Sequence, residues 1–153
     1  MSSTKSVPSD VAFTDSVKKA QARLGSRQAY ARMEQGEGWE TVISPELASF
    51  ISERDSFFFA TSNAEGQPYI QHRGGPKGFL RVLDERTLAF ADFRGNRQYI
   101  SVGNLAENAK VHLFLVDYLH RQRIKIWGEA RVIEDVADPL VLRISSNLAP
   151  RVE

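Results

Sequence analysis

The sequence predicts a mainly β fold of the α+β class, an antiparallel barrel with accessory helices. Three observations favour it. About six short strand-like segments follow one another between residues 57 and 133, with turn residues between them at hairpin spacing. Helical periodicity is confined to the flanks and to one short stretch among the strands. Closely spaced strands in hairpin order are typical of antiparallel barrels and sandwiches, and we favour the barrel.

The N-terminal third predicts helices. Helical periodicity runs from Thr14 to Gln35, and Gly25 is a plausible break because glycine weakens a helix interior. A second helix opens with Ser44 as the cap, proline at the first helical position and Glu46 in the first turn. This helix is expected to end near Arg54.

The expected strands then follow in hairpin order. The strand FFFAT at 57–61 and a return strand at 67–72 flank a turn from Asn63 to Gly66. The other expected strands cover residues 79–83, 87–91, 111–116 and 123–133. The last of them contains Gly128, where we expect a bend or bulge. Two more helices are expected, at 99–108 and 140–147.

Length and composition are those of an ordinary globular domain. The chain has 153 residues, of which 42% are hydrophobic and 25% charged, which fits one domain. We expect the polar residues 1–12 to be disordered and residues 13–153 to form a single domain. Twenty Lys and Arg against 19 Asp and Glu leave a net charge of +1. A field this weak predicts neither a nucleic-acid partner nor a membrane partner.

Residue usage narrows the chemistry further. The absence of cysteine excludes disulfides and thiolate ligands, and three histidines give little basis for a metal site, so none is expected. No apolar run approaches the roughly 18 residues of a membrane span. The N-terminus lacks an apolar signal core. A cytoplasmic location is the default expectation.

Polar clusters stand where the expected strands meet loops. They are Gln71-His72-Arg73, Ala91-Asp92, Asn96-Arg97-Gln98 and Arg121-Gln122-Arg123. Arginine forks match phosphate oxygens, and a helix starting after Arg97 would add its free N–H groups to the same anion. From the residues alone, a phosphate site at one rim of a barrel and solvated arginines flanking the strands both stay open.

The order of these motifs resembles one family. The segment PYIQHRGGPKGFLRVLDERTLAFADFRGNRQYISVGNLAEN, followed by RQRIKIWGEARVIE, is similar to pyridoxamine 5'-phosphate oxidase-related proteins over about residues 40 to 135. The resemblance implies an FMN-binding split β-barrel, FMN as the cofactor and a homodimer with the cofactor between two subunits. It also implies an oxidoreductase whose flavin carries the redox chemistry.

The resemblance implies roles for matching positions. An arginine-led strand would line the flavin ring and phosphate with Gln71, His72, Arg73 and Gly74. A two-residue contact after Phe90 would be made by Ala91 and Asp92. The turn on the phosphate would be formed by Asn96, Arg97 and Gln98. The polar edge of the flavin would meet Gln122 by the Arg-Gln pair, or Arg123 by the spacing from Gly128. No residue is nominated as a catalytic acid or base.

Two departures from the family pattern disfavour the vitamin B6 reaction itself. Gln98 stands where members usually carry lysine, which removes a positive charge from the phosphate turn. The sequence ends at Glu153 without the arginine- and tryptophan-containing stretch that helps the oxidase hold its substrate. The substrate, expected to be a small molecule, therefore stays unidentified. The alternatives are a non-catalytic flavin-binding or storage protein, or a split barrel for deazaflavin or haem.

Overall fold

The computed structural model describes residues 6–92 and 97–134. The chain divides into two compact units, Met1–Ile43 and Ser44–Glu153, where the sequence analysis expected one domain beginning at residue 13. The helix expected at 140–147 lies outside the described residues. Among the helices in the described ranges, none is long and apolar enough to cross a membrane.

The described part of the first unit, from residue 6 onward, contains three short helices. They are the 3-10 helix η1 (Pro8–Val11) and the α-helices α1 (Asp15–Arg23) and α2 (Arg27–Gln35). Helical structure thus begins inside the segment expected to be disordered. The break expected at Gly25 is confirmed: α1 ends and α2 begins on either side of it, and Gly25 has a φ of 85°. Left-handed backbone of this kind is accessible to glycine at little cost.

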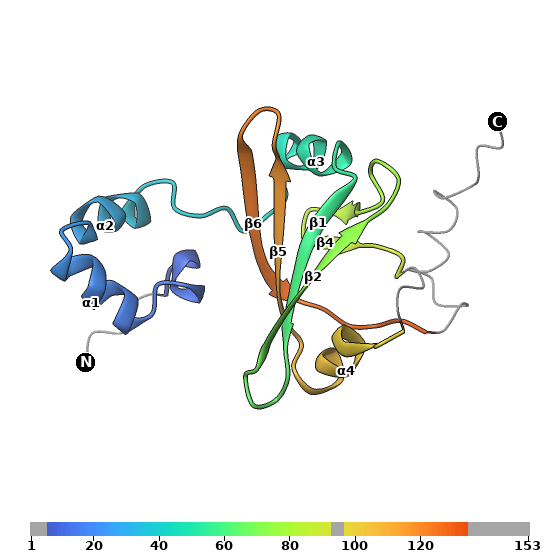
Figure 1. Ribbon diagram of the computed structural model, residues 1–153. Coiled ribbons are helices and arrows are strands. Elements are labelled where there is room, and N and C mark those ends of the chain that lie inside the picture. The colour runs from blue at the N-terminus through green and yellow to red at the C-terminus, as the bar shows by residue number, and fades with distance from the viewer. Residues whose placement is uncertain (1–5, 93–96, 135–153) are drawn as a thin grey trace. The chain divides into compact units, whose positions relative to one another are not determined.

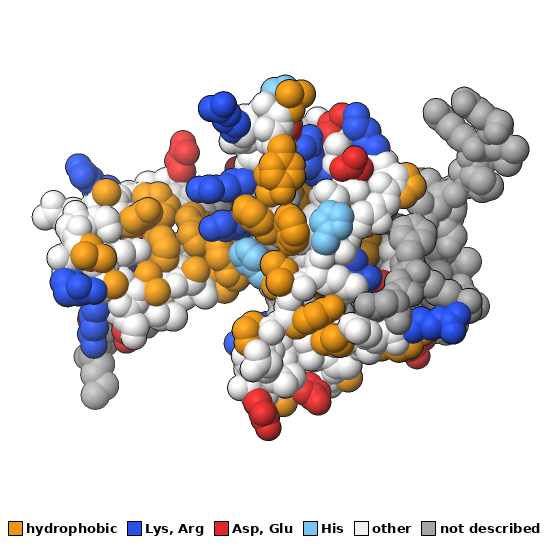
Figure 2. Space-filling model, in the orientation of Figure 1, with side chains coloured by type: hydrophobic (Ala, Val, Ile, Leu, Met, Phe, Trp, Pro, Cys, Tyr) orange, Lys and Arg blue, Asp and Glu red, His pale blue; other side chains and the backbone are white. Residues whose placement is uncertain are grey.

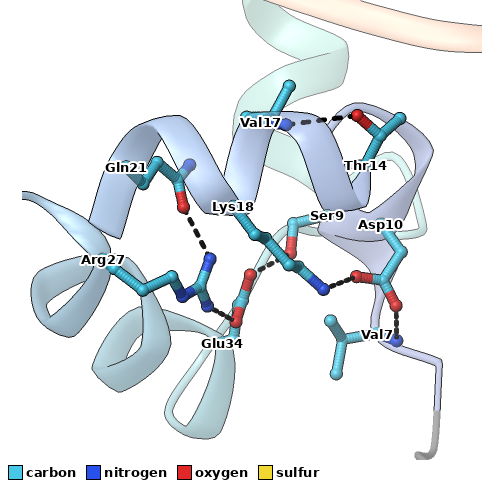
Figure 3. A network of polar contacts seen from close by, with 9 residues as sticks. All are labelled: Val7, Ser9, Asp10, Thr14, Val17, Lys18, Gln21, Arg27 and Glu34. Atoms are coloured by element: carbon cyan, nitrogen blue, oxygen red, sulfur yellow. Dashed lines mark hydrogen bonds and ion pairs between the residues drawn. The ribbon is translucent and has the colours of Figure 1, made fainter. Parts of the chain in front are cut away.

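A polar network joins the helices of this unit, as Figure 3 shows. Arg27 donates to Gln21 Oε1 at 2.6 Å and pairs with Glu34. Lys18 pairs with Asp10 at 2.6 Å, which ties α1 to η1. The Phe13 ring lies 5.2 Å from two other rings, those of Tyr30 and Trp39. Trp39 is therefore a packing residue of this unit.

The second unit begins with helix α3 (Pro45–Ser52). Ser44 caps it, because its Oγ accepts from Leu47 N at 3.2 Å, as the sequence predicted. Within the described residues up to 134, six strands and helix α4 follow. Their bounds are β1 (Ser56–Ser62), β2 (Pro68–Gly74), β3 (Arg81–Asp84), β4 (Thr87–Ala89), α4 (Ile100–Glu107), β5 (Lys110–Asp117) and β6 (Gln122–Glu129).

The described strands form two antiparallel sheets. One has the order β2-β1-β5-β6, and the other pairs β3 with β4 (Figure 1). The mixed α+β class with antiparallel strands is confirmed, and two separate sheets rather than a closed barrel are consistent with a split barrel. The hairpin turn is confirmed as well: Asn63 Oδ1 accepts from Gln67 N at 2.9 Å, and Gly66 has a φ of 84°.

The prediction for the last strand was partly wrong. Strand β6 ends at Glu129 rather than at residue 133, and it contains no bulge at Gly128. Gly128 pairs with Val111 in an unbroken register from Lys110 to Asp117. The sequence signal misled because glycine in a strand often marks a bulge, whereas here it only leaves the strand without a side chain at that point.

A cluster of phenylalanines forms the core between the two sheets. Phe57 stacks on Phe79 at 5.4 Å, and Phe90 lies edge-on to both Phe57 and Phe59, at 5.2 and 5.5 Å. Phe79 precedes β3 and Phe90 follows β4, so these rings join the small sheet to the large one. Ring pairs in such geometry add about 0.5–1.5 kcal/mol each beyond the area they bury.

The glycine-rich loop after β2 is fixed by packing. Gly75 N donates to Asp55 O and Gly78 N donates to Arg54 O, both at 2.9 Å. A Cβ added at Gly75 would lie 2.8 Å from the Phe79 ring, whereas one added at Gly74 would meet its nearest atom at 3.5 Å. Gly75 therefore serves the core contact of Phe79, and its missing side chain is explained without a ligand.

The far end of β5 is held by a charged cluster. Asp117 accepts from the His120 ring at 2.8 Å and pairs with Arg54 at 3.2 Å. The hydrogen bonds from His120, together with the charge of Arg54, lower the pKa of Asp117 to about 2 from its ordinary 3.8. The cluster joins the end of α3 to the β5–β6 turn.

We expect Gly75→Ala to lower the free energy of unfolding by about 1–3 kcal/mol, because the added methyl group overpacks the Phe79 ring. Gly74→Ala is the matched control one residue away, where the added carbon meets only ordinary contacts. Urea unfolding of both variants measures the difference. Equal stability of the two variants would contradict the packing role.

The Asp117 carboxylate should stabilise the fold in a pH-dependent way. Its lowered pKa means that the stabilisation is present above pH 3.8 and is lost as the pH falls towards about 2. Asp117→Asn should therefore cost more stability near neutral pH than at the acid end of this window. Urea unfolding at both ends tests this, with Glu65→Gln, at an exposed position of the turn between β1 and β2, as the control. A cost that is the same at both ends would refute it.

Candidate functional site

Strand β2 places two of the predicted site residues on the inner face of the large sheet. Gln71 pairs with Phe59 and Arg73 with Phe57, both buried phenylalanines of β1. Because side chains alternate along a strand, Gln71 and Arg73 share the core-facing side. His72 between them points to the opposite face.

Arg73 is held by two residues that follow β4. Its Nη1 donates to Asp92 Oδ1, and its guanidinium carbon lies 5.9 Å from the centre of the Phe90 ring. The Arg73 side chain is 15% exposed, and that of Asp92 is 46% exposed. The ion pair brings together two of the polar clusters predicted from the sequence, Gln71-His72-Arg73 and Ala91-Asp92. It also balances the charge of Arg73, which therefore adds little net positive charge to the site.

Helix α4 starts beside Gln71. Ser101, in the first turn of α4 and buried, donates from Oγ to Gln71 Oε1 at 3.3 Å. The start of α4 therefore lies at the inner face of β2, beside Gln71.

Arg97 and Gln98 form the approach to α4, and both are exposed. Arg97 has a φ of 60° and Tyr99 a φ of 55°. Tyr99 is the N-cap residue of α4 and makes no side-chain capping bond. The first N–H groups of a helix lack partners within the helix, so this start combines backbone donors with the Arg97 guanidinium.

Two asparagines fix α4 on the sheet. Asn104 Nδ2 donates to Thr61 Oγ1, and Asn108 Nδ2 donates to Ser62 Oγ, both at 2.9 Å. Thr61 is a buried residue on the inner side of β1. These bonds set where the helix start stands relative to β2.

The remaining predicted residues do not join this group within one chain. Gly74 follows His72 in the alternation, on the same outward side at the end of β2. Gln122 and Arg123 open β6, at the other edge of the sheet, where Gln122 pairs with Asp117 and Arg123 with Val116. This register puts Gln122 on the inner side and Arg123 on the outer side. Ala91 adjoins Asp92, and Asn96 lies outside the described residues.

Sequence reasoning missed Ser101. It reaches Gln71 across 30 positions of sequence, and a serine in a helix carries no local sign of such a contact. For Asp92 the sequence predicted a cofactor contact by resemblance and, from its residue type, either the orientation of an arginine or the capping of a loop; the structure shows it paired with Arg73. A basic residue and an acidic residue at two neighbouring strand ends were the available signal for it.

The shifted pKa values of the described residues lie away from this site. The pKa is lowered for Asp10 by Lys18, for Glu53 by Lys77 and for His112 by burial and Lys125. Asp117 belongs to the α3–β5 cluster. In the described ranges, no group of three or more metal-binding side chains comes together. The site thus consists of the Gln71 amide, the Arg73–Asp92 ion pair, and Arg97 before the start of α4, which together offer hydrogen bonds to a polar ligand.

A comparison with protein families decides the assignment of the fold. The family model described as pyridoxamine 5'-phosphate oxidase matches residues 43–148. The chain belongs to the pyridoxamine 5'-phosphate oxidase-related family. The match covers the whole of the large sheet, α4 and the site described above, and it leaves out the helices of the first unit. No curated protein matches the chain.

Two solved structures are similar in fold. One is a variant of HupZ from Group A Streptococcus, with 22% identity, a TM-score of 0.47, and coverage of 58% of this chain and 69% of that one. The other is HutZ, the haem storage protein of Vibrio cholerae, with 19% identity, a TM-score of 0.44, and coverage of 69% and 72%. At these values neither similarity bears on the ligand of this chain.

The asparagine anchors of α4 give a test of the site's framework. Asn104→Ala should lower the free energy of unfolding by about 1–3 kcal/mol, because it leaves the buried Thr61 hydroxyl without this partner. Gly103→Ala, next to it in α4, meets no atom within 4 Å. It should stabilise by about 0.4–1 kcal/mol. Thermal unfolding of both variants measures this, and a shift of the same sign in both would contradict the anchoring role.

Proposed function

We propose that this protein is an FMN-binding flavoprotein and an oxidoreductase acting on a small molecule. The observation that carries the proposal is the start of α4. There, Arg97 lies three residues before the first helical residue, the N-cap Tyr99 makes no side-chain capping bond, and Ser101 contacts Gln71. A phosphate is the ligand that suits a guanidinium and a helix N-terminus at once. Gln98 would supply a neutral donor where the family usually has lysine.

The inner face of β2 would receive the ring system. Gln71 offers an amide, which can both donate and accept hydrogen bonds, as the polar edge of a flavin requires. Arg73 is fixed in place by Asp92 and Phe90. The residues present therefore fit FMN: cationic and backbone donors for its phosphate, and an oriented amide and guanidinium for its ring.

A second copy of the chain would complete the site. Gln71 and Arg73 lie on β2 and Gln122 lies on β6, the two edge strands of the large sheet. Three strand spacings separate these edges, or about 14 Å. Residues so far apart on one sheet reach one flavin most readily when β6 comes from a partner subunit. This supports a homodimer, with a cytoplasmic location as the accompanying expectation.

When bound, FMN would supply the electron or hydride transfer. The side chains named above would bind and orient it, and none is assigned a proton-transfer step. The vitamin B6 reaction stays disfavoured because Gln98 stands where the family usually has lysine.

One preparation of the purified protein is enough to distinguish FMN from deazaflavin and haem, and an enzyme from a storage protein. The visible spectrum of the purified protein with added FMN, deazaflavin or haem identifies the ligand that is retained. Reduction of a bound flavin, followed by oxygen or candidate acceptors, then distinguishes turnover from storage. A protein that binds none of the three ligands refutes the proposal, and a flavin that is bound but never reoxidised in a substrate-linked way favours the storage protein.

The phosphate assignment predicts the effect of Arg97→Ala. Loss of a charge-assisted hydrogen bond should cost about 1.5–3 kcal/mol of binding, which raises the Kd for FMN about tenfold or more. Quenching of flavin fluorescence measures it. Arg86→Ala, in the exposed turn between β3 and β4, is the control and should leave the Kd unchanged. If Arg97→Ala binds FMN with an unchanged Kd, the assignment of Arg97 to the phosphate is wrong.

A further inference from the structure

The two ends of the ion pair between Arg73 and Asp92 differ in burial. Arg73 Nη1 donates to Asp92 Oδ1. The Arg73 side chain is 15% exposed, whereas that of Asp92 is 46% exposed. Water therefore solvates the carboxylate where it stands but has little access to the guanidinium. The two residues come from different parts of the fold, Arg73 from β2 and Asp92 from the segment after β4.

Arg73 is held by packing as well as by its charged partner. It pairs with the buried Phe57 in the register of β1 and β2, and the centre of the Phe90 ring lies 5.9 Å from its guanidinium carbon. Within the described residues, the Nε atom of Arg73 is buried and has no hydrogen-bond partner. The place of the guanidinium thus does not depend on Asp92 alone, and at least one of its donors is unused.

A cation in this position needs a counter-ion. Burial of a charge is costly unless an opposite charge and hydrogen bonds compensate it, and Asp92 supplies that compensation for Arg73. A carboxylate or phosphate group of a ligand forms the same charge-assisted hydrogen bonds with a guanidinium, so it would serve Arg73 equally well. Because Asp92 is half exposed, its own carboxylate loses little when it turns to water instead.

We propose that Asp92 is an exchangeable counter-ion of Arg73, which an oxyanion of the bound ligand displaces. Asp92 then acts as a competitor built into the site, and it lowers the affinity of the site for anionic ligands. This inference rests on the proposed function and names a residue that sets the affinity and the charge selectivity of that site. The oxyanion comes either from the FMN phosphate or from an acidic substrate bound together with the flavin.

A purely structural role for the ion pair makes the opposite prediction. If the pair of Arg73 and Asp92 only holds the segment after β4 against β2, then removal of the carboxylate charge loosens that segment and weakens the binding of every ligand. If Asp92 competes with the ligand, removal of its charge strengthens the binding of anionic ligands. The sign of the change in affinity therefore distinguishes the two roles.

Asp92→Asn keeps the size of the side chain and removes its charge. The Kd for FMN, measured by flavin fluorescence, should be about tenfold lower in this variant than in the wild type, because one charge-assisted hydrogen bond becomes available to the phosphate. Riboflavin, which has the same ring system without the phosphate, should bind with an unchanged Kd. Glu85→Gln removes an exposed carboxylate in the turn between β3 and β4, and it is the control that should change neither Kd.

An anionic ligand also meets cations outside this ion pair. Arg123 and Lys125 are exposed on β6, and Figure 2 shows Lys and Arg side chains gathered along that strand. The Asp92→Asn change is therefore repeated in an Arg73→Gln background. The exchange requires the gain in FMN affinity to disappear there, and a gain that persists without Arg73 would overturn the proposal.

The two sources of the oxyanion give different results. If the FMN phosphate displaces Asp92, the Asp92→Asn variant binds FMN more tightly and riboflavin as before. If an acidic substrate displaces Asp92, the Kd for FMN stays the same. Inorganic phosphate, used as the probe, then raises the melting temperature of the FMN-loaded variant more than that of the FMN-loaded wild type. Either result supports the exchange.

Three further results overturn the exchange: weaker FMN binding by Asp92→Asn, an equal gain for FMN and riboflavin, or an unchanged Kd for FMN together with equal responses of both FMN-loaded proteins to phosphate. A protein that binds no FMN refutes the proposed function instead. The exchange is then tested without flavin, by the melting temperatures of Asp92→Asn and the wild type in inorganic phosphate. A larger rise in the variant supports the exchange, and an equal rise overturns it.

Discussion

The alternation of side chains along β1 is the constraint on which the rest of the structure depends. Three consecutive phenylalanines occupy the strand, and a strand sends neighbours to opposite faces. Phe57 and Phe59 therefore enter the core, where they meet Phe79 and Phe90 and hold the small sheet against the large one. Phe58 points to the outward side of the sheet, where its ring lies 5.4 Å from the His72 ring. A slip of one residue in the pairing of β1 would bring Phe58 into the core and turn Phe57 and Phe59 outward.

The same alternation decides what the site contains. Gln71 and Arg73 face the core side because their partners on β1 are Phe59 and Phe57. Helix α4 then completes the site, since Asn104 and Asn108 bind it to Thr61 and Ser62 near the other end of β1. The start of α4 is thereby brought to Gln71. One strand thus aligns both the polar groups and the helix start that the proposed FMN site requires.

Local signals in the sequence were sufficient to predict several helix ends and turns. The Ser44 cap, the Gly25 break and the Asn63–Gly66 turn each depend on a few neighbouring residues, and each was predicted. The prediction of a bulge at Gly128 was wrong, because whether a strand bulges at a glycine depends on its pairing with the partner strand. The sequence also grouped His72 with Gln71 and Arg73 by proximity along the chain. Which face a residue of β2 takes is set by long-range pairing with β1. In the same way, the pairing of β6 with β5 places Gln122 on the inward side and Arg123 on the outward side.

The backbone of the turn before α4 carries a cost that a different sequence would avoid. Arg97 and Tyr99 both adopt left-handed φ angles, which disfavour residues with a Cβ by roughly 1–2 kcal/mol each. Glycine at either position would relieve this strain, yet the chain has a long cationic and an aromatic side chain there. Under the proposed function, the strain at Arg97 is the cost of placing its guanidinium at the phosphate. A stabilised version of this protein designed by relaxing that turn would be expected to lose function first.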